Sequence, residues 1–213
     1  EAAGGGGFVI NGTKIGDVSG KSVSGAGDVN GDGKDDLIIG AYGADPNGNS
    51  SSGSSYVVFG TESTSAIELS ILEEEGGGGF VINGVDENDK SGYSVSGAGD
   101  VNGDGLDDVI IGAYQADPNG NDSGSSYVVF GKVDKAAVDL SILEEEGGSG
   151  FVINGVNTAD NSGHSVSGAG DVNGDGLDDV IIGALGADPN GTSSGSSYVV
   201  FGTDSTDAIE LST

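Results

Sequence analysis

The string Gly-Ala-Gly-Asp-Val-Asn-Gly-Asp-Gly stands at residues 25–33 and recurs at residues 97–105 and 168–176. The copies begin 72 and then 71 residues apart, so one unit is written three times. A period of this kind is typical of repeat architectures, in which a single unit cannot bury its apolar face alone. We therefore predict three repeat units: 1–79, with an N-terminal outer strand at 8–12, then 80–150 and 151–213.

Each unit contains four short segments with the composition of β-strands, which in the first unit are 8–11, 21–27, 36–41 and 55–59. The third segment is continuously apolar, as expected of a strand covered on both faces. The second is rich in Ser, Gly and Ala, which suits an innermost strand where large side chains would collide. Four short strands per unit favour a propeller blade. We predict an all-β fold, a β-propeller of four-stranded antiparallel blades with three blades per chain.

The charge balance narrows the classes of partner. Among 213 residues there are 35 acidic side chains against six Lys and no Arg, giving a net charge of −29. Such a chain repels nucleic acid and anionic membrane surfaces, and it favours divalent cations as partners. The sequence has no Cys, which excludes disulfides and thiolate zinc sites. It also has no apolar run of about 18 residues and no leader-like segment, so we expect neither a membrane span nor an attached leader.

The loop between the second and third predicted strands has the spacing of a metal site. Counted from Asp28, oxygen side chains fall at positions 1, 3, 5 and 9, and Gly at position 6 permits a sharp turn. The carbonyl at position 7 adds a further oxygen. Ca²⁺, which takes 6 to 8 oxygens, is favoured over the smaller Mg²⁺. The alternative is that these residues form ordinary turns.

Electrostatic repulsion also favours a bound ion, because two carboxylates about 5 Å apart repel by roughly 3 kcal/mol at an effective dielectric of 20. We expect the residues at position 8, Asp35, Asp107 and Asp178, to point outward as solvated charges. We predict three calcium ions per chain, and the predicted ligands are Asp28, Asn30, Asp32, Lys34 and Asp36; Asp100, Asn102, Asp104, Leu106 and Asp108; and Asp171, Asn173, Asp175, Leu177 and Asp179.

These units resemble FG-GAP repeats, the blades of integrin α-subunit propellers and of many large secreted bacterial proteins. The resemblance is carried by Asp-Val-Asn-Gly-Asp-Gly-x-Asp-Asp, the following Ile-Ile-Gly-Ala, and the Val-Val-Phe-Gly that ends at Gly60, Gly131 and Gly202. It implies a propeller with calcium in its hairpin loops, in an extracellular or cell-surface context. An EF-hand is excluded because position 12 is Ile39 and its equivalents instead of Glu. The chain departs from the family where Gly-Ala is followed by Tyr or Leu instead of Pro, and in having three units only.

Three blades are too few for a ring, since propellers usually close with 4 to 8. The last unit ends after its strand at 197–201 and lacks an outer strand, whereas the first unit has a spare one at 8–11. We expect a homodimer in which two chains exchange these ends and close a six-bladed ring. The alternatives are a fragment of a longer array and a self-closed toroid of three blades.

No catalytic arrangement is predicted, because no Gly-x-Ser-x-Gly strand-to-helix elbow with an acid and a His partner can be assembled, and the single His, His164, belongs to one unit only. We expect a non-catalytic, calcium-stabilised module for extracellular adhesion or ligand display, whose ligand would be a protein or a glycan. Two alternatives stay open. One is a structural or engineered scaffold of duplicated blades without a ligand, and the other is the non-catalytic part of a secreted enzyme that acts on polysaccharides.

Overall fold

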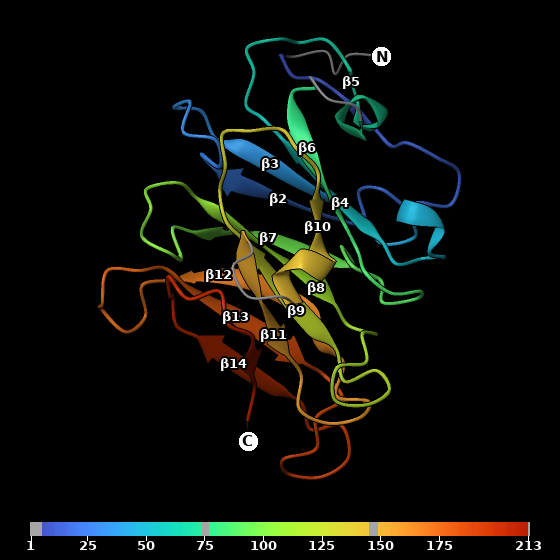
Figure 1. Cartoon of the computed structure of the whole chain (residues 1–213), viewed down its shortest axis with the longest axis vertical. Helices are drawn as coiled ribbons and strands as arrows, with labels where there is room; N and C mark the ends of the chain where they lie inside the picture. Colours follow the sequence, from blue (N-terminus) through green and yellow to red (C-terminus); the bar gives the residue numbers. More distant parts are fainter. Residues whose placement is uncertain (1–5, 74–76, 145–148, 213) are drawn as a thin grey trace.

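The computed structural model describes residues 6–73, 77–144 and 149–212 and is built from short β-strands and single 3-10 turns (Figure 1). None of the helical segments in these residues is long and apolar enough to cross a membrane. The described residues form β-strands, short 3-10 turns and loops, so the predicted all-β class is confirmed. The elements are β1 (Ile10–Asn11), β2 (Ser22–Gly27), β3 (Asp36–Ala41), η1 (Pro46–Gly48), β4 (Ser54–Val58), β5 (Ile67–Glu68), η2 (Leu69–Glu73), β6 (Gly79–Asn83), β7 (Ser94–Gly99), β8 (Asp108–Ala113), β9 (Ser125–Val129), β10 (Val138–Asp139), η3 (Leu140–Glu144), β11 (Gly150–Asn154), β12 (Ser162–Gly170), β13 (Asp179–Ala184), β14 (Ser196–Val200) and β15 (Ile209–Glu210).

Three sheets repeat one antiparallel order and have the form of propeller blades. Blade 1 consists of β2, β3, β4 and β6, blade 2 of β7, β8, β9 and β11, and blade 3 of β12, β13 and β14. The predicted four-stranded blade is thus found twice, and blade 3 has three strands in the described part of the chain. The sheets follow one another along the long axis of the molecule (Figure 1).

The outer strand of each complete blade comes from the following unit. β6 pairs antiparallel with β4 in the register Tyr56↔Val81, and β11 pairs in the same way with β9. Outside it lies a two-residue strand that sequence reasoning missed: β10 pairs parallel with β6, and β15 with β11. Blades 1 and 2 therefore each depend on chain from more than one unit.

The Ser-, Gly- and Ala-rich strands β2, β7 and β12 form the inner edges of the blades and lie beside one another. A Cβ added to Gly97 would lie 2.7 Å from the carbonyl oxygen of Gly25, and one on Gly168 would lie 2.8 Å from that of Gly97. No real side chain fits at such a distance. The predicted innermost position of these strands is confirmed, and Gly is what permits the approach.

Apolar side chains between the blades form the core. One cluster joins Ile38 and Val57 of blade 1 to Val109 and Tyr127 of blade 2, all at most 2% exposed. A second cluster joins the other face of blade 2 to blade 3. Burial of these side chains, at about 25 cal/mol per Å² of apolar surface, is the main source of cohesion between neighbouring blades.

Substitution of Gly112 tests this close packing. A Cβ at Gly112 would overlap the carbonyl oxygen of Gly163 in the next blade, whereas a Cβ at Gly78 has open space. We expect Gly112→Ala to lower the free energy of unfolding by about 1–3 kcal/mol through overpacking, and the control Gly78→Ala to change it by less than about 0.5 kcal/mol. Chemical denaturation measures both, and equal effects would contradict the proposed contact.

Candidate metal centre

The acidic loops connect the inner strand of each blade to its second strand. Each loop begins at a β-bulge in which Gly27, Gly99 or Gly170 adopts a positive φ between 68° and 76°. The bulge turns the chain out of the sheet. Within the loop, two further glycines have φ values in the left-handed region, 74° and 85° at Gly31 and Gly33. Loops 1, 2 and 3, at residues 28–36, 100–108 and 171–179, therefore share one backbone shape.

The first carboxylate of each loop is the centre around which the backbone curls. Asp28 accepts the N–H groups of Asp32 and Gly33 at 2.9 and 2.8 Å, and the Asn30 side-chain oxygen accepts the Asp32 N–H at 2.8 Å. The same bonds recur around Asp100 and Asp171. The residues predicted at positions 1, 3 and 5 thus lie together on one turn, as their spacing implies.

The aspartate at position 9 is buried in every loop. Asp36 accepts the Val29 N–H at 3.0 Å with one oxygen and the Gly60 N–H at 2.7 Å with the other. Asp108 and Asp179 make the equivalent pairs of bonds, and all three residues are 0% exposed. This carboxylate ties the loop to the glycine shortly after β4, β9 or β14. A Cβ on the Gly that ends each Val-Val-Phe-Gly would lie within 2.7 Å of the loop, so the close contact requires Gly there.

Burial makes this carboxylate costly to ionise. Desolvation raises the pKa of Asp108 to about 7, and the neighbouring charges of Asp104 and Asp100 raise it further against the two backbone hydrogen bonds that lower it. Desolvation also raises the pKa of Asp36. A cation beside these groups would favour their charged forms, so the loops have the electrostatics of a site that a positive ion stabilises.

The donor set fits a hard cation in its chemistry. Each loop offers three carboxylates, one amide oxygen and the main-chain carbonyl of Lys34, Leu106 or Leu177, and Ca²⁺ prefers such oxygens. Within the described residues, no three His, Cys, Asp or Glu side chains already form a compact metal cluster. Loop 1 differs from the others because the Lys34 ammonium lies 3.8 Å from Asp32. That pair is exposed and of little energetic weight.

The aspartates at position 8 do not all point into solvent, so that expectation is wrong for two of them. Asp107 accepts the N–H of Asp28 at 2.7 Å, and Asp178 accepts that of Asp100 at 3.0 Å. Each therefore bridges to the loop of the preceding blade. Asp35 is exposed, as expected. Sequence reasoning missed this bridge because its partner is a backbone group more than 70 residues away.

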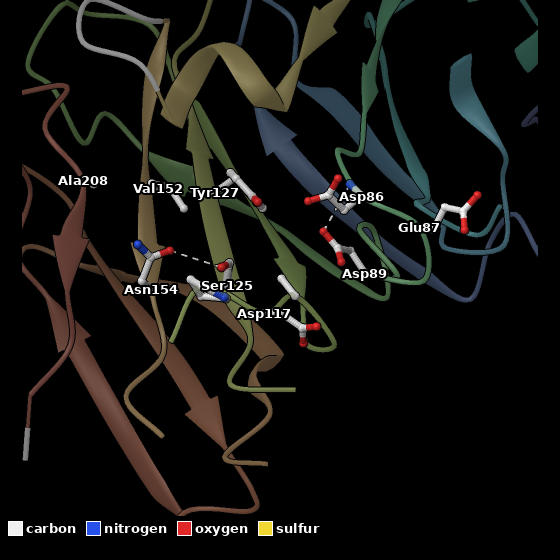
Figure 2. Close-up of a pocket in the computed structure, with 11 residues that line it drawn as sticks. Asp86, Glu87, Asp89, Asp117, Ser125, Tyr127, Val152, Asn154 and Ala208 are labelled. Carbon is white, nitrogen blue, oxygen red and sulfur yellow. Dashed lines mark hydrogen bonds between the residues drawn. The ribbon is translucent and has the colours of Figure 1, made fainter. Parts of the chain in front are cut away.

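A second acidic feature lies toward the outer strands. Figure 2 shows a hollow of about 340 Å³ lined by Asp86, Asp89, Asp117, Tyr127 and Asn154 among others. A smaller hollow occupies the corresponding place in blade 1. The Asp117 carboxylate accepts the N–H of Asp122 at 2.7 Å and closes its own turn.

Aromatic side chains gather at the opposite ends of the inner strands from the loops. Tyr93 contacts Tyr114 and His164 with ring centroids 4.6 and 5.0 Å apart and ring planes tilted by 56° and 51°, and Tyr42 meets Tyr93 edge-on. The Lys21 ammonium lies 5.2 Å from the Tyr93 ring centroid. Desolvation, and then the charge of Lys21, lower the pKa of His164. This aromatic cluster (Tyr42, Tyr93, Tyr114 and His164) is half-buried.

Comparison with known proteins agrees with the geometry. The chain matches the FG-GAP repeat family at residues 19–58, 91–129 and 162–200. It is 32% identical over 177 residues to integrin alpha pat-2 of Caenorhabditis elegans, covering 81% of this chain and 14% of that protein. It is 30% identical over 187 residues to integrin alpha-PS2 of Drosophila melanogaster, covering 85% of this chain and 12% of that protein. The chain thus spans a small part of these relatives.

The raised pKa of Asp108 predicts how calcium-free protein responds to pH. Between about pH 4 and pH 7 the unfolded chain ionises this carboxyl while the folded chain keeps it protonated. The free energy of unfolding therefore falls as pH rises through this window. In chelator, we expect the melting temperature to drop between pH 5 and pH 8, and to drop less in Asp108→Asn. The exposed control Asp204→Asn should keep the full drop, and an equal drop in all three proteins would contradict the assignment.

Proposed function

Because this chain belongs to the FG-GAP repeat family of integrin α-like proteins, we propose that it is a calcium-stabilised β-propeller module for extracellular adhesion or ligand display. FG-GAP repeats are a generally non-catalytic family, and the proposal includes no catalytic activity. The observation that carries it is the buried aspartate of each loop, which sits beside two further carboxylates in a chain of net charge −29.

Each loop would hold one Ca²⁺ through the residues at positions 1, 3, 5, 7 and 9. A bound ion supplies the positive charge that offsets repulsion among the three carboxylates of a loop. The protein's part is to place the oxygens, which the glycine turns and the backbone hydrogen bonds to Asp28 and Asp36 accomplish in loop 1. Extracellular calcium, at millimolar levels, fills sites of modest affinity, which supports a secreted or cell-surface location.

The aromatic cluster is the best candidate for the ligand-binding surface. Clustered rings beside the Lys21 ammonium offer apolar faces and one positive charge on a strongly acidic protein. Aromatic faces of this kind bind protein side chains and sugar rings. The ligand class is therefore a protein or a glycan, and nucleic acid is disfavoured by charge.

Calcium titration tests the loops. We expect calorimetry to give three sites per chain and two in Asp104→Ala, which removes one carboxylate of loop 2. At ten times the dissociation constant each ion stabilises by about 1.4 kcal/mol, so three ions raise the melting temperature by roughly 10 °C over chelator. The control Asp204→Ala should keep three sites. A melting temperature that chelator leaves unchanged would exclude a structural ion.

A protein and glycan array tests ligand display. We expect at least one binder in calcium buffer, with binding lost in Tyr93→Ala, because that ring contacts the other three members of the aromatic cluster and the Lys21 ammonium. The substitution Tyr198→Ala in blade 3 is a matched control outside the cluster. Absence of any binder would favour the alternative function, a structural scaffold without a ligand.

A further inference from the structure

We propose that a second copy of this chain docks on the free face of blade 3, and that two such contacts close a six-bladed ring of two chains. The proposal rests on the contacts between blades, and it requires neither the calcium sites nor a ligand. The occupant is a second copy because the chain carries both halves of the contact, one on blade 1 and the other on blade 3.

The strands at the two ends are complementary. β14 pairs only with β13 among the described residues, whereas β4 and β9 each have an outer antiparallel neighbour. Residues 8–11 have the same Phe-Val-Ile-Asn sequence that β6 and β11 contain. Only Ile10–Asn11 of this segment forms a strand, β1, through a parallel pair with β5. In the register of β4 with β6, β14 of one copy pairs with residues 7–11 of the other.

Blade 3 exposes apolar side chains that blades 1 and 2 bury. Val199 is 46% exposed, against 0% for Val57 and Val128 at the equivalent positions. Val172 is 60% exposed, against 0% for Val29. In blades 1 and 2 the next blade covers these positions, as the core clusters show, whereas no described residue covers them in this way on blade 3.

Blade 1 exposes the matching opposite face. Val23 is 64% exposed, whereas its equivalent Val95 is 5% exposed. A Cβ on Gly25 has open space, whereas one on Gly97 or Gly168 would collide with the backbone of the preceding blade. Blade 1 therefore has the shape needed to approach a preceding blade closely, and blade 3 of a second copy supplies one.

The acidic loops carry an unmatched pair of polar groups. In loops 2 and 3 the position-8 carboxylate accepts the first N–H of the preceding loop at 2.7 and 3.0 Å. The Asp35 carboxylate and the Asp171 N–H have no such partner within the described residues, and Asp35 is exposed. When a second copy docks as the next blade would, its Asp35 accepts the N–H of Asp171, so loop 3 is completed by the other chain.

Backbone groups farther from the inner strands show the same pattern, paired between neighbouring blades and unpaired at the two ends. In residues 84–91, four N–H groups donate to the carbonyl groups of residues 50–53, including Gly84 to Gly53 at 2.8 Å. Residues 155–162 and 121–124 make the equivalent bonds. The corresponding donors in residues 12–19 and acceptors in residues 192–195 make none of these bonds in the described chain. Docking would pair them in the same register.

A head-to-tail contact either closes into a ring or extends into a filament. Propellers usually have 4 to 8 blades. One chain supplies three blades and three chains supply nine, so a ring of two chains with six blades falls within this range. Two chains of net charge −29 repel each other. At 0.15 M salt the screening length is about 8 Å, so the short-range apolar contact dominates under that condition.

Molar mass by light scattering tests the ring. At micromolar concentration in 0.15 M salt with millimolar calcium, we expect twice the chain mass of 20.7 kDa. Gly25→Val should give the mass of one chain with an unchanged far-ultraviolet spectrum, because Val at this position has space within the chain and collides only with the second copy. The control Gly78→Val, also in open space, should stay dimeric.

A wild-type mass of one chain, a filament or trimer, or an undiminished dimer in Gly25→Val would each overturn the proposal. Repeating the measurement in chelator separates the two proposals: a dimer that persists without calcium supports the contact even if the loops bind no ion.

The carboxylate bridge has its own matched pair of variants. Asp35→Ala removes the bridge between chains, so we expect the dimer dissociation constant to rise at least tenfold, with the melting temperature of the dilute monomer unchanged. Asp107→Ala removes the same bond inside one chain, so we expect a lower melting temperature without a change in dissociation constant. Equal behaviour of the two variants would show that Asp35 makes no contact across the interface.

Discussion

Each blade depends on one buried carboxylate. The aspartate at position 9 of the loop accepts two backbone N–H groups. One comes from the start of its own loop and the other from the glycine shortly after β4, β9 or β14. It thereby fixes the loop against the sheet. Burial raises the pKa of Asp108 to about 7 and raises that of Asp36, and each lies near two other carboxylates of its loop. A cation at this place would offset those charges.

The second constraint is the distance between inner strands. Gly97 and Gly168 let their strands approach the backbone of the preceding blade more closely than any side chain permits. This approach brings each loop within hydrogen-bonding reach of the preceding loop, which is what Asp107 and Asp178 use. Stability and loop geometry are therefore shared between blades, and a blade without a neighbour leaves polar and apolar groups uncovered.

The curled shape of the loops could be predicted because it depends on residues that lie close together in the sequence. The spacing of Asp28, Asn30 and Asp32 and the nearby glycines specifies a curled turn whatever surrounds it. The bridges made by the position-8 aspartates were not predictable, since the same residue type is solvated at Asp35 and bonded at Asp107. The parallel strand β10 was also missed, because a two-residue strand has no periodicity of its own.

The sequence alone determined the repeat and the order of the strands within a unit, because both follow from short-range pattern and composition, and the same pattern predicts the oxygen donors of each loop. Tertiary structure decided which copies of identical segments are complete. The sequence Gly-Phe-Val-Ile-Asn forms a five-residue strand at β6 and β11, whereas in its first copy only the last two residues form a strand, β1. The reason is physical: a strand exists through the hydrogen bonds of its neighbour, and whether a neighbour is present depends on how distant units pack.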